Sequence, residues 1–192
     1  LFVGRNDLPQ ATLNELNRIK ARNVYIIGGY GAVSNAVENQ LKNQGFNVRR
    51  ISGSNTKDSA NNVARELKKY SNFNTAILTD NNNFPDALTS SSYAGINEIP
   101  ILYSDKEYIE KSTLQAMKDL NINRVIIVGG ENSISTSVRR SVEALGISVD
   151  RVAGLNRYET SKLFTDKYFY NANNLVIASG EVWPDALVGG RL

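Results

Sequence analysis

The residues of this sequence that could do chemistry are carboxylates, lysines, arginines, hydroxyl groups and tyrosines, because the chain contains no cysteine and no histidine. Disulfides, thiol nucleophiles and zinc sites built on thiolate or imidazole are therefore excluded. Ser-His and Cys-His dyads are excluded for the same reason. Any ligand must be handled by charge, by hydrogen bonding or by carboxylate chemistry.

Two arginines stand in equivalent short motifs. Arg50 begins Arg-Ile-Ser-Gly, and Arg151 begins Arg-Val-Ala-Gly. After the second motif the chain continues to Arg157 in Asn-Arg-Tyr-Glu-Thr, whereas the first continues to Thr56 and Lys57. A guanidinium suits two-pronged contact with phosphate or carboxylate. A recurring arginine could equally brace a turn or meet a carboxylate of a neighbouring unit, and both interpretations stay open.

An acidic motif opens a predicted helix in two places. Phe84-Pro85-Asp86-Ala87-Leu88 returns as Trp183-Pro184-Asp185-Ala186-Leu187. Proline suits the first helical turn, and an aspartate there favours the positive end of the helix dipole. This structural interpretation explains every residue of the motif. The alternative makes Asp86 and Asp185 acids, bases or metal ligands.

Glycine pairs follow two predicted strands, Gly28-Gly29 and Gly129-Gly130. Such turns can present backbone N–H groups to phosphate. Neither the spacing of the dinucleotide fingerprint nor that of the mononucleotide loop is present, so a tight strand-to-helix turn is the favoured interpretation.

These motifs belong to an internal repeat of about a hundred residues, the kind of signal that indicates a tandem array. Val24 to Gly29 returns as Val125 to Gly130, and Phe84 to Leu88 returns as Trp183 to Leu187. The phase predicts the later half of a repeat at 1–49, a complete repeat at 50–150 and the earlier half of another at 151–192. We therefore expect a longer parent protein.

Short apolar runs alternate with amphipathic patterns inside the complete repeat. Strands are predicted at 75–79, 99–103 and 124–128, with a weaker one at 149–152, and helical faces include Val63, Leu67 and Tyr70. Continuous apolar strands separated by helices require a parallel sheet covered on both faces. The predicted fold is α/β, each repeat a three-layer sandwich with a mainly parallel sheet of flavodoxin-like or topoisomerase-primase-like type.

Charge and hydropathy restrict the partners. The chain has 22 basic and 19 acidic residues, a net charge of +3. This balance falls short of a dedicated nucleic-acid binder but suits weak contact with a polyanion. No apolar run approaches the roughly 20 residues that span a membrane. No nucleic acid, membrane or cofactor is expected as a partner.

The combined motifs resemble the clostridial type 2 cell-wall-binding repeat. The resemblance rests on Arg-x-x-Gly with Asn-Arg-Tyr-Glu-Thr, the Trp/Phe-Pro-Asp-Ala-Leu helix start, Ile99-Pro100-Ile101-Leu102, and the strand that ends in Gly-Gly. It implies repeats packed as a pseudo-trimer that hold secreted surface and S-layer proteins on an anionic cell-wall glycopolymer, without catalysis.

The polymer-binding candidates that follow are Arg50, Lys57, Ile99, Pro100, Ile101, Leu102, Arg151 and Arg157. The complete repeat lacks the arginine and tyrosine of Arg-Tyr-Glu-Thr, and Lys57 is the candidate substitute. Two alternatives remain: a metal-dependent hydrolase or phosphoryl-transfer enzyme using Asp80, Asp86 and Glu131, and a structural spacer or adhesin array.

Overall fold

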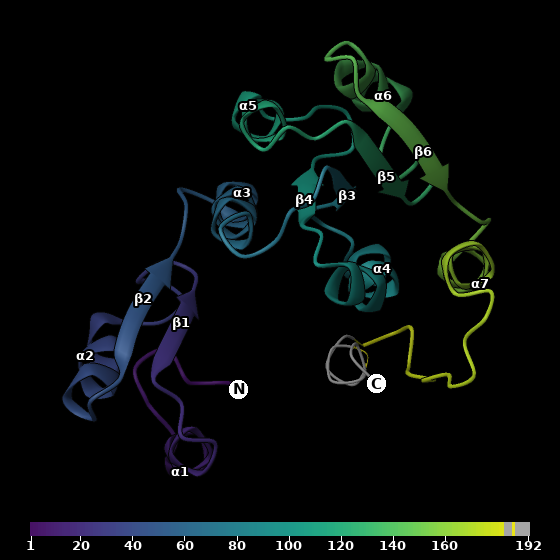
Figure 1. Cartoon of the computed structure of the whole chain (residues 1–192). Helices are drawn as coiled ribbons and strands as arrows, with labels where there is room; N and C mark the ends of the chain where they lie inside the picture. The colour runs from purple at the N-terminus through teal and green to yellow at the C-terminus, as the bar shows by residue number, and fades with distance from the viewer. Residues whose placement is uncertain (183–185, 187–192) are drawn as a thin grey trace. The chain divides into compact units, whose positions relative to one another are not determined.

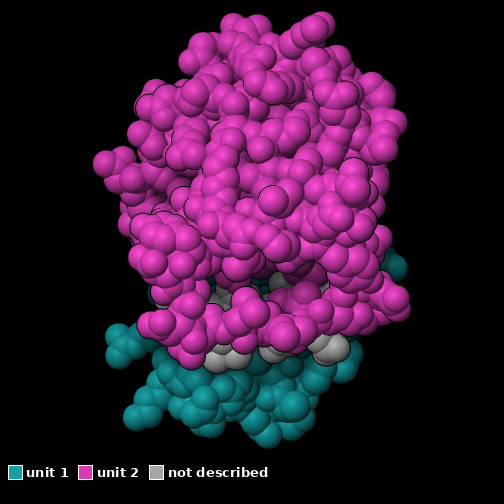
Figure 2. All heavy atoms as spheres, turned by 90° about the vertical axis from the view of Figure 1, so that its right-hand side faces the viewer, with its two compact units in different colours: residues 1–63 teal, residues 64–192 magenta. Residues whose placement is uncertain are grey.

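The computed structural model describes residues 1–182 and 186. The chain forms two compact units, residues 1–63 and 64–192 (Figure 2). The division falls inside a helix, at a different place from the predicted repeat boundaries, which stay a prediction.

Helices and parallel strands alternate along the chain (Figure 1). In order, the elements are α1 (Gln10–Arg18), β1 (Asn23–Ile27), α2 (Asn35–Asn43), β2 (Asn47–Ile51), α3 (Thr56–Leu67), β3 (Thr75–Asp80), α4 (Phe84–Asn97), β4 (Ile101–Ser104), α5 (Lys111–Asp119), β5 (Arg124–Val128), α6 (Thr136–Glu143), β6 (Ser148–Val152) and α7 (Arg157–Tyr168). In the part of the chain that the structure describes, no helix is long and apolar enough to cross a bilayer. The predicted α/β class is confirmed.

The larger unit is built on a four-stranded parallel sheet in the order β4-β3-β5-β6. The chain starts at β3, moves outward to β4 and then returns to the other side of β3. This is the order of the first four strands of a flavodoxin-like sheet. Figure 1 shows α5 and α6 on one face of the sheet, and α4 and α7 on the other. The sheet therefore lies between two helical layers, as predicted.

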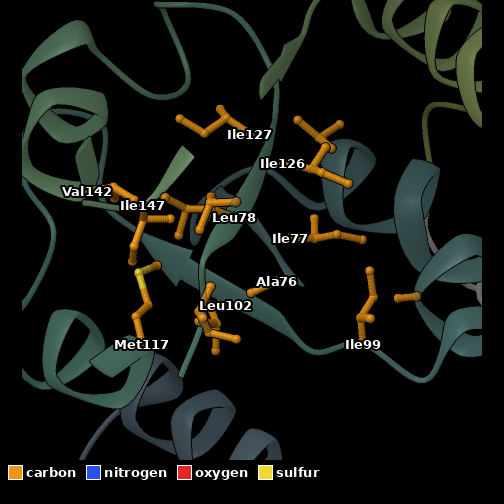
Figure 3. Packing of buried hydrophobic residues seen from close by; sticks show 14 of the residues in the cluster. Ala76, Ile77, Leu78, Ile99, Leu102, Met117, Ile126, Ile127, Val142 and Ile147 are labelled. Atoms are coloured by element: carbon orange, nitrogen blue, oxygen red, sulfur yellow. The ribbon is translucent and has the colours of Figure 1, made fainter. Parts of the chain in front are cut away.

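Alternating strand residues fill the two faces of this sheet. Ile77 and Ile126 are register partners, as are Leu78 and Ile127, and all four are fully buried. Figure 3 shows Leu78 and Ile127 on the side of Met117, whereas Ile77 and Ile126 point to the opposite side. Apolar residues on both faces explain why the sequence shows continuous apolar runs.

The repeat is visible in the bounds of the elements. α1, β1, β2 and α3 have the same lengths as α5, β5, β6 and α7, each displaced by 101 residues. The registers agree too, since Asn23 pairs with Asn47 and Arg124 pairs with Ser148. One predicted helical face was wrong at its end, because α3 stops at Leu67 and Tyr70 is 68% exposed.

The copies differ in what covers their strands. Ile27 of β1 is 53% exposed, whereas its counterpart in β5, Val128, is fully buried. β5 pairs with β6 on one side and with β3 on the other, but β1 pairs only with β2 among the described residues. The counterparts of β3 near Leu175 and Ile177 form no strand and are 72% and 88% exposed. A strand needs a partner strand to pair with, and none pairs with this segment among the described residues.

The turn after β5 requires glycine at position 129. Gly129 has φ +116, and a Cβ there would lie 2.5 Å from Asp86 Oδ2 and 3.1 Å from Ser133 Cβ. Its counterpart Gly28 has φ +108 but meets only Ala32. The glycine therefore permits both a left-handed backbone and the close approach of α4 to the turn.

We expect Gly129→Ala to destabilise the larger unit by about 1–3 kcal/mol, because the added methyl group combines backbone strain with a clash against Asp86. The measurement is the urea midpoint followed by circular dichroism. Gly95→Ala in α4 is the control, since a Cβ at that position meets nothing within 4 Å and alanine favours a helix. An unchanged midpoint for Gly129→Ala would contradict the packing described here.

Candidate functional site

Arg50 and Arg151 make the same contact in the two copies. Arg50 Nη1 donates a hydrogen bond to the Gly28 carbonyl oxygen at 2.8 Å, and Arg151 Nη1 donates to the Gly129 carbonyl oxygen at 2.7 Å. Arg151 Nη2 also donates to the Ile134 carbonyl oxygen at 2.8 Å. Each guanidinium thus ties the end of a strand to the glycine turn beside it. Of the two roles considered for these arginines, bracing a turn is the contact observed.

Arg50 has a second, ionic partner. Its Nε lies 2.8 Å from Glu38 Oε2, and both side chains are less than 10% exposed. Its guanidinium also lies 4.3 Å from the centroid of the Tyr30 ring. Hydrogen bonds from Lys42 and Arg50 hold the pKa of Glu38 below its usual value. This arginine is therefore largely occupied by its own unit.

The remaining candidates of the complete repeat lie in the interior. Lys57 is buried on α3. Ile99 and Leu102 belong to the apolar core, Pro100 is buried, and Ile101 is half-buried at the start of the edge strand β4. The Pro100 carbonyl oxygen accepts a hydrogen bond from Ile77 N at 2.9 Å. In the complete repeat, this segment holds β4 to β3.

Arg157 is the exposed member of the predicted set. It opens α7, where the Asn156 side chain caps the helix by accepting hydrogen bonds from the backbone N–H groups of Tyr158 and Glu159. Arg157 Nη1 donates to the Gly180 carbonyl oxygen at 2.5 Å. Arg157 and Tyr158 border a groove of about 440 Å³ that is lined by α4, by α7, and on its remaining side by residues from Phe169 to Gly180 and by Ala186.

α7 is fixed on the sheet by one carboxylate. Asp150 on β6 accepts hydrogen bonds from Lys167 Nζ at 2.7 Å, from the Tyr168 hydroxyl at 3.0 Å and from Arg124 Nη2 at 3.3 Å. Burial opposes ionisation of Asp150, but these donors outweigh it and lower its pKa. α7 is also joined to α4 by aromatic contact, with Tyr93 and Tyr168 ring centroids 4.7 Å apart. α7 is therefore held both to the sheet and to α4.

Asp86 lies in the first turn of α4 and is only 4% exposed. Asn83 Nδ2 donates to its Oδ2 at 3.3 Å. Burial raises the pKa of Asp86 to about 6, against the effects of a hydrogen bond from Ser133 and the charge of Arg157. Its position at the helix start is the structural role predicted for this motif. Asp185, its counterpart, lies outside the described residues.

The carboxylates of the alternative enzyme hypothesis have separate local partners. Asp80 Oδ1 accepts a hydrogen bond from Asn82 N at 3.0 Å, and Glu131 Oε1 accepts one from Thr136 Oγ1 at 2.6 Å. Within residues 1–182 and 186, no three acidic side chains are grouped so that they could hold a metal ion.

Residues 50–139 and 151–192 match the family described as Cell wall binding domain 2 (CWB2). The chain belongs to the CWB2 family. The resemblance inferred from the motifs is thereby confirmed, and the family places the chain among wall-binding domains.

Two curated relatives match this CWB2 chain along its whole length. One is the N-acetylmuramoyl-L-alanine amidase LytC of Bacillus subtilis, 32% identical over 192 residues, and the other is the amidase enhancer of the same organism, 31% identical. The chain covers 37% of the first protein and 26% of the second. It therefore spans roughly a third of these relatives.

Two solved structures share the fold. Cwp6 from Clostridium difficile aligns with a TM-score of 0.82 at 27% identity, covering 89% of this chain and 28% of Cwp6. Cwp8 from the same organism aligns with a TM-score of 0.77 at 28% identity, covering 88% of this chain and 29% of Cwp8.

Removing the turn brace should cost stability. Arg151→Met leaves the carbonyl oxygens of Gly129 and Ile134 without their donors, so we expect a loss of about 1–3 kcal/mol in the free energy of unfolding. Arg140→Met, at an exposed position of α6, is the matched loss of charge and should leave the urea midpoint unchanged. An Arg151 variant of full stability that binds walls poorly would instead identify this arginine as a polymer contact.

Asp86 should give the stability a distinctive dependence on pH. Because its folded pKa of about 6 lies above the ordinary 3.8, the folded state binds more protons between these values. The stability that protonated Asp86 contributes is therefore lost as the pH rises through about 6. No histidine titrates in this range.

We expect the thermal unfolding temperature of the unaltered chain to decrease as the pH is raised from 5 to 8. In Asp86→Asn this dependence on pH should be weaker. At pH 8 the variant should be the more stable protein by about 1–3 kcal/mol, since it removes a buried charge. Asp166→Asn, at an exposed position of α7, should retain the profile of the unaltered chain. A falling profile in Asp86→Asn would assign the titration to another group.

Proposed function

We propose that this chain is a non-catalytic module that holds a secreted surface protein non-covalently on an anionic polymer of the cell wall. The observation that carries the proposal is the match of residues 50–139 and 151–192 to the CWB2 family, together with the helices and strands that recur at a displacement of 101 residues. Neighbouring repeats packed as a pseudo-trimer, and S-layer proteins on the same surface, are the partners that belong to this proposal.

The relatives support a shared binding role. An amidase and an amidase enhancer differ in their roles, yet each contains a segment similar to the whole of this chain. Because most of each relative lies outside that segment, attachment is the simplest role for what they have in common. Wall hydrolysis is then a property of the remaining parts of the amidase. The absence of cysteine and histidine removes the commonest nucleophile and base pairs from the segment itself.

The predicted polymer-binding residues differ in how well their surroundings suit that role. Arg157 is exposed and borders a groove, so it is the contact that we favour. Arg50 and Arg151 hold turns, and Lys57 is buried. Ile99, Pro100 and Leu102 are buried and Ile101 is half-buried, before and at the start of β4, so a role in binding would run through the shape of the repeat.

The test is co-sedimentation of the chain with purified Clostridium difficile cell walls across a salt series. We expect binding that weakens as salt rises, because exposed charges are screened, and that disappears after hydrofluoric acid has stripped phosphate-containing polymers from the walls. Dye-labelled walls incubated with the chain should release no dye, since the chain supplies no catalysis.

Each departure has a definite meaning. Binding that survives stripping would redirect the proposal to peptidoglycan or wall protein, and absence of binding to intact walls would overturn it. Release of dye would contradict the non-catalytic role. The chain denatured and refolded serves as the control for trapping by aggregation.

A further inference from the structure

The helix after the glycine turn carries opposite charges in the two copies. Glu38 is the fourth residue of α2, and Arg139 is the fourth residue of α6, 101 positions later. The partner one turn further along is exchanged as well, since Glu38 pairs with Lys42 whereas Arg139 pairs with Glu143. The valine that precedes each of the two residues is fully buried. Both side chains therefore start from the same place on equivalent helices.

In the first copy this helix position supplies an anion to the arginine of the neighbouring strand. Glu38 Oε2 lies 2.8 Å from Arg50 Nε, and both side chains are buried. At the same time Arg50 Nη1 donates to the Gly28 carbonyl oxygen. The Glu38 carboxylate thus shows where an oxyanion lies when it binds the Nε edge of the strand arginine while the Nη1 group braces the turn.

The second copy has no carboxylate at this position. Arg151, the counterpart of Arg50, donates through its two Nη atoms to backbone carbonyl oxygens. Its Nε has no hydrogen-bond partner among the described residues, and no described carboxylate forms an ion pair with it. The side chain is only half-buried, so the Nε edge remains available to a ligand.

Two guanidinium groups approach each other in the second copy. Burial lowers the pKa of Arg151, the charge of Glu131 raises it, and the charge of Arg139 lowers it. Arg139 is therefore close enough to repel Arg151. Glu131 is exposed and accepts a hydrogen bond from Thr136 Oγ1 at 2.6 Å, so it weakens the repulsion without occupying the Nε edge. An oxyanion between the two guanidiniums receives charge-assisted hydrogen bonds from both.

This position belongs to the face of the sheet that α5 and α6 cover. Arg151 is the register partner of Ile127, and Ile127 lies on the side of Met117 of α5 (Figure 3). α4 and α7 lie on the opposite face (Figure 1). The position is therefore built from α6 and β6 alone, both of which are described throughout.

We propose that Arg139 and the Nε edge of Arg151 bind an oxyanion of the wall polymer, a phosphate or a carboxylate group, at the place that the Glu38 carboxylate fills in the first copy. This inference rests on the proposed function and adds a contact to Arg157. A copy with glutamate at this helix position supplies the anion itself, and a copy with arginine takes it from the ligand. Arg151 still braces its turn, because the brace uses the Nη atoms.

The first test gives the second copy the charges of the first. The double variant Arg139→Glu/Glu143→Lys leaves the net charge unchanged and places a carboxylate beside Arg151 Nε, as Glu38 lies beside Arg50. It should fold with unchanged or higher stability, because an acidic residue four positions before a lysine favours a helix. Its affinity for purified C. difficile walls should fall about tenfold, the effect of losing one charge-assisted hydrogen bond.

A matched reversal on α7 controls for the exchange itself. Lys162→Asp/Asp166→Lys inverts an exposed ion pair of the same spacing, again without a change in net charge. It should bind walls as the unaltered chain does. Circular dichroism and urea midpoints establish that both variants are folded. Full wall affinity in Arg139→Glu/Glu143→Lys, or an equal loss in both variants, would overturn the assignment.

The Nε–H signals of the arginines in nuclear magnetic resonance spectra test the contact on the unaltered chain. Inorganic phosphate and sodium acetate are titrated separately into the full chain. We expect the Arg151 signal to shift and the Arg50 signal to stay in place, because Glu38 already holds the Arg50 group. A response to phosphate alone identifies a phosphate group as the ligand, and a response to acetate identifies a carboxylate group. No shift at Arg151, or an equal shift at Arg50, would refute the site.

The two levels of the proposal fail differently. If the unaltered chain does not bind walls, the proposed function fails. If it binds walls while Arg139→Glu/Glu143→Lys binds equally well and the Arg151 signal does not move, only the contact at Arg139 and Arg151 fails.

Discussion

The parallel ladder between β3 and β5 is the interaction on which the larger unit depends. It joins the two central strands, and three of its four residue pairs are fully buried, on both faces of the sheet. Only with this ladder in place do α4 and α7 have a surface on which to lie side by side. The smaller unit shows the consequence of lacking it, since β1 matches β5 in bounds and register yet leaves Ile27 half-exposed. Completeness of the sheet, more than the sequence of any one strand, decides which residues are buried.

Strand placement could be predicted well because it follows from local hydrophobic pattern. The run at 124–128 is β5, and the run at 75–79 is β3 without its last residue. The predicted 99–103 strand starts later, at Ile101, because Pro100 has no N–H to donate to a ladder and contributes only its carbonyl oxygen. Strand order could not be predicted, since the side of β3 on which each later strand adds is set by packing across the whole sheet.

The site was less predictable, for reasons specific to each residue. Arg50 and Arg151 were equally compatible with bracing and with anion binding, because both roles use the same donors; only the carbonyl oxygens of Gly28 and Gly129 distinguish them. The cavity beside Arg157 depends on two helices, α4 and α7, that are some seventy positions apart in the sequence. No local signal predicts it, because α3 and α7 match in length and place but share no residue at equivalent positions.

The division of labour among the arginines bears on how such a repeat can hold a polymer. An arginine that donates to carbonyl oxygens within its own fold is constrained by stability, so it recurs at the same place in each copy, as Arg50 and Arg151 do. Arg157 also donates to a carbonyl oxygen, that of Gly180, but it is exposed, and its place in the first copy is taken by threonine. A single exposed guanidinium is a weak site by itself, because exposed charge pairs contribute little at physiological salt. Where several copies stand in one protein, each further site acts at a high effective concentration on a polymer already held. Attachment by this route is strong only for a ligand that repeats as the protein does, which is the property of a wall polymer.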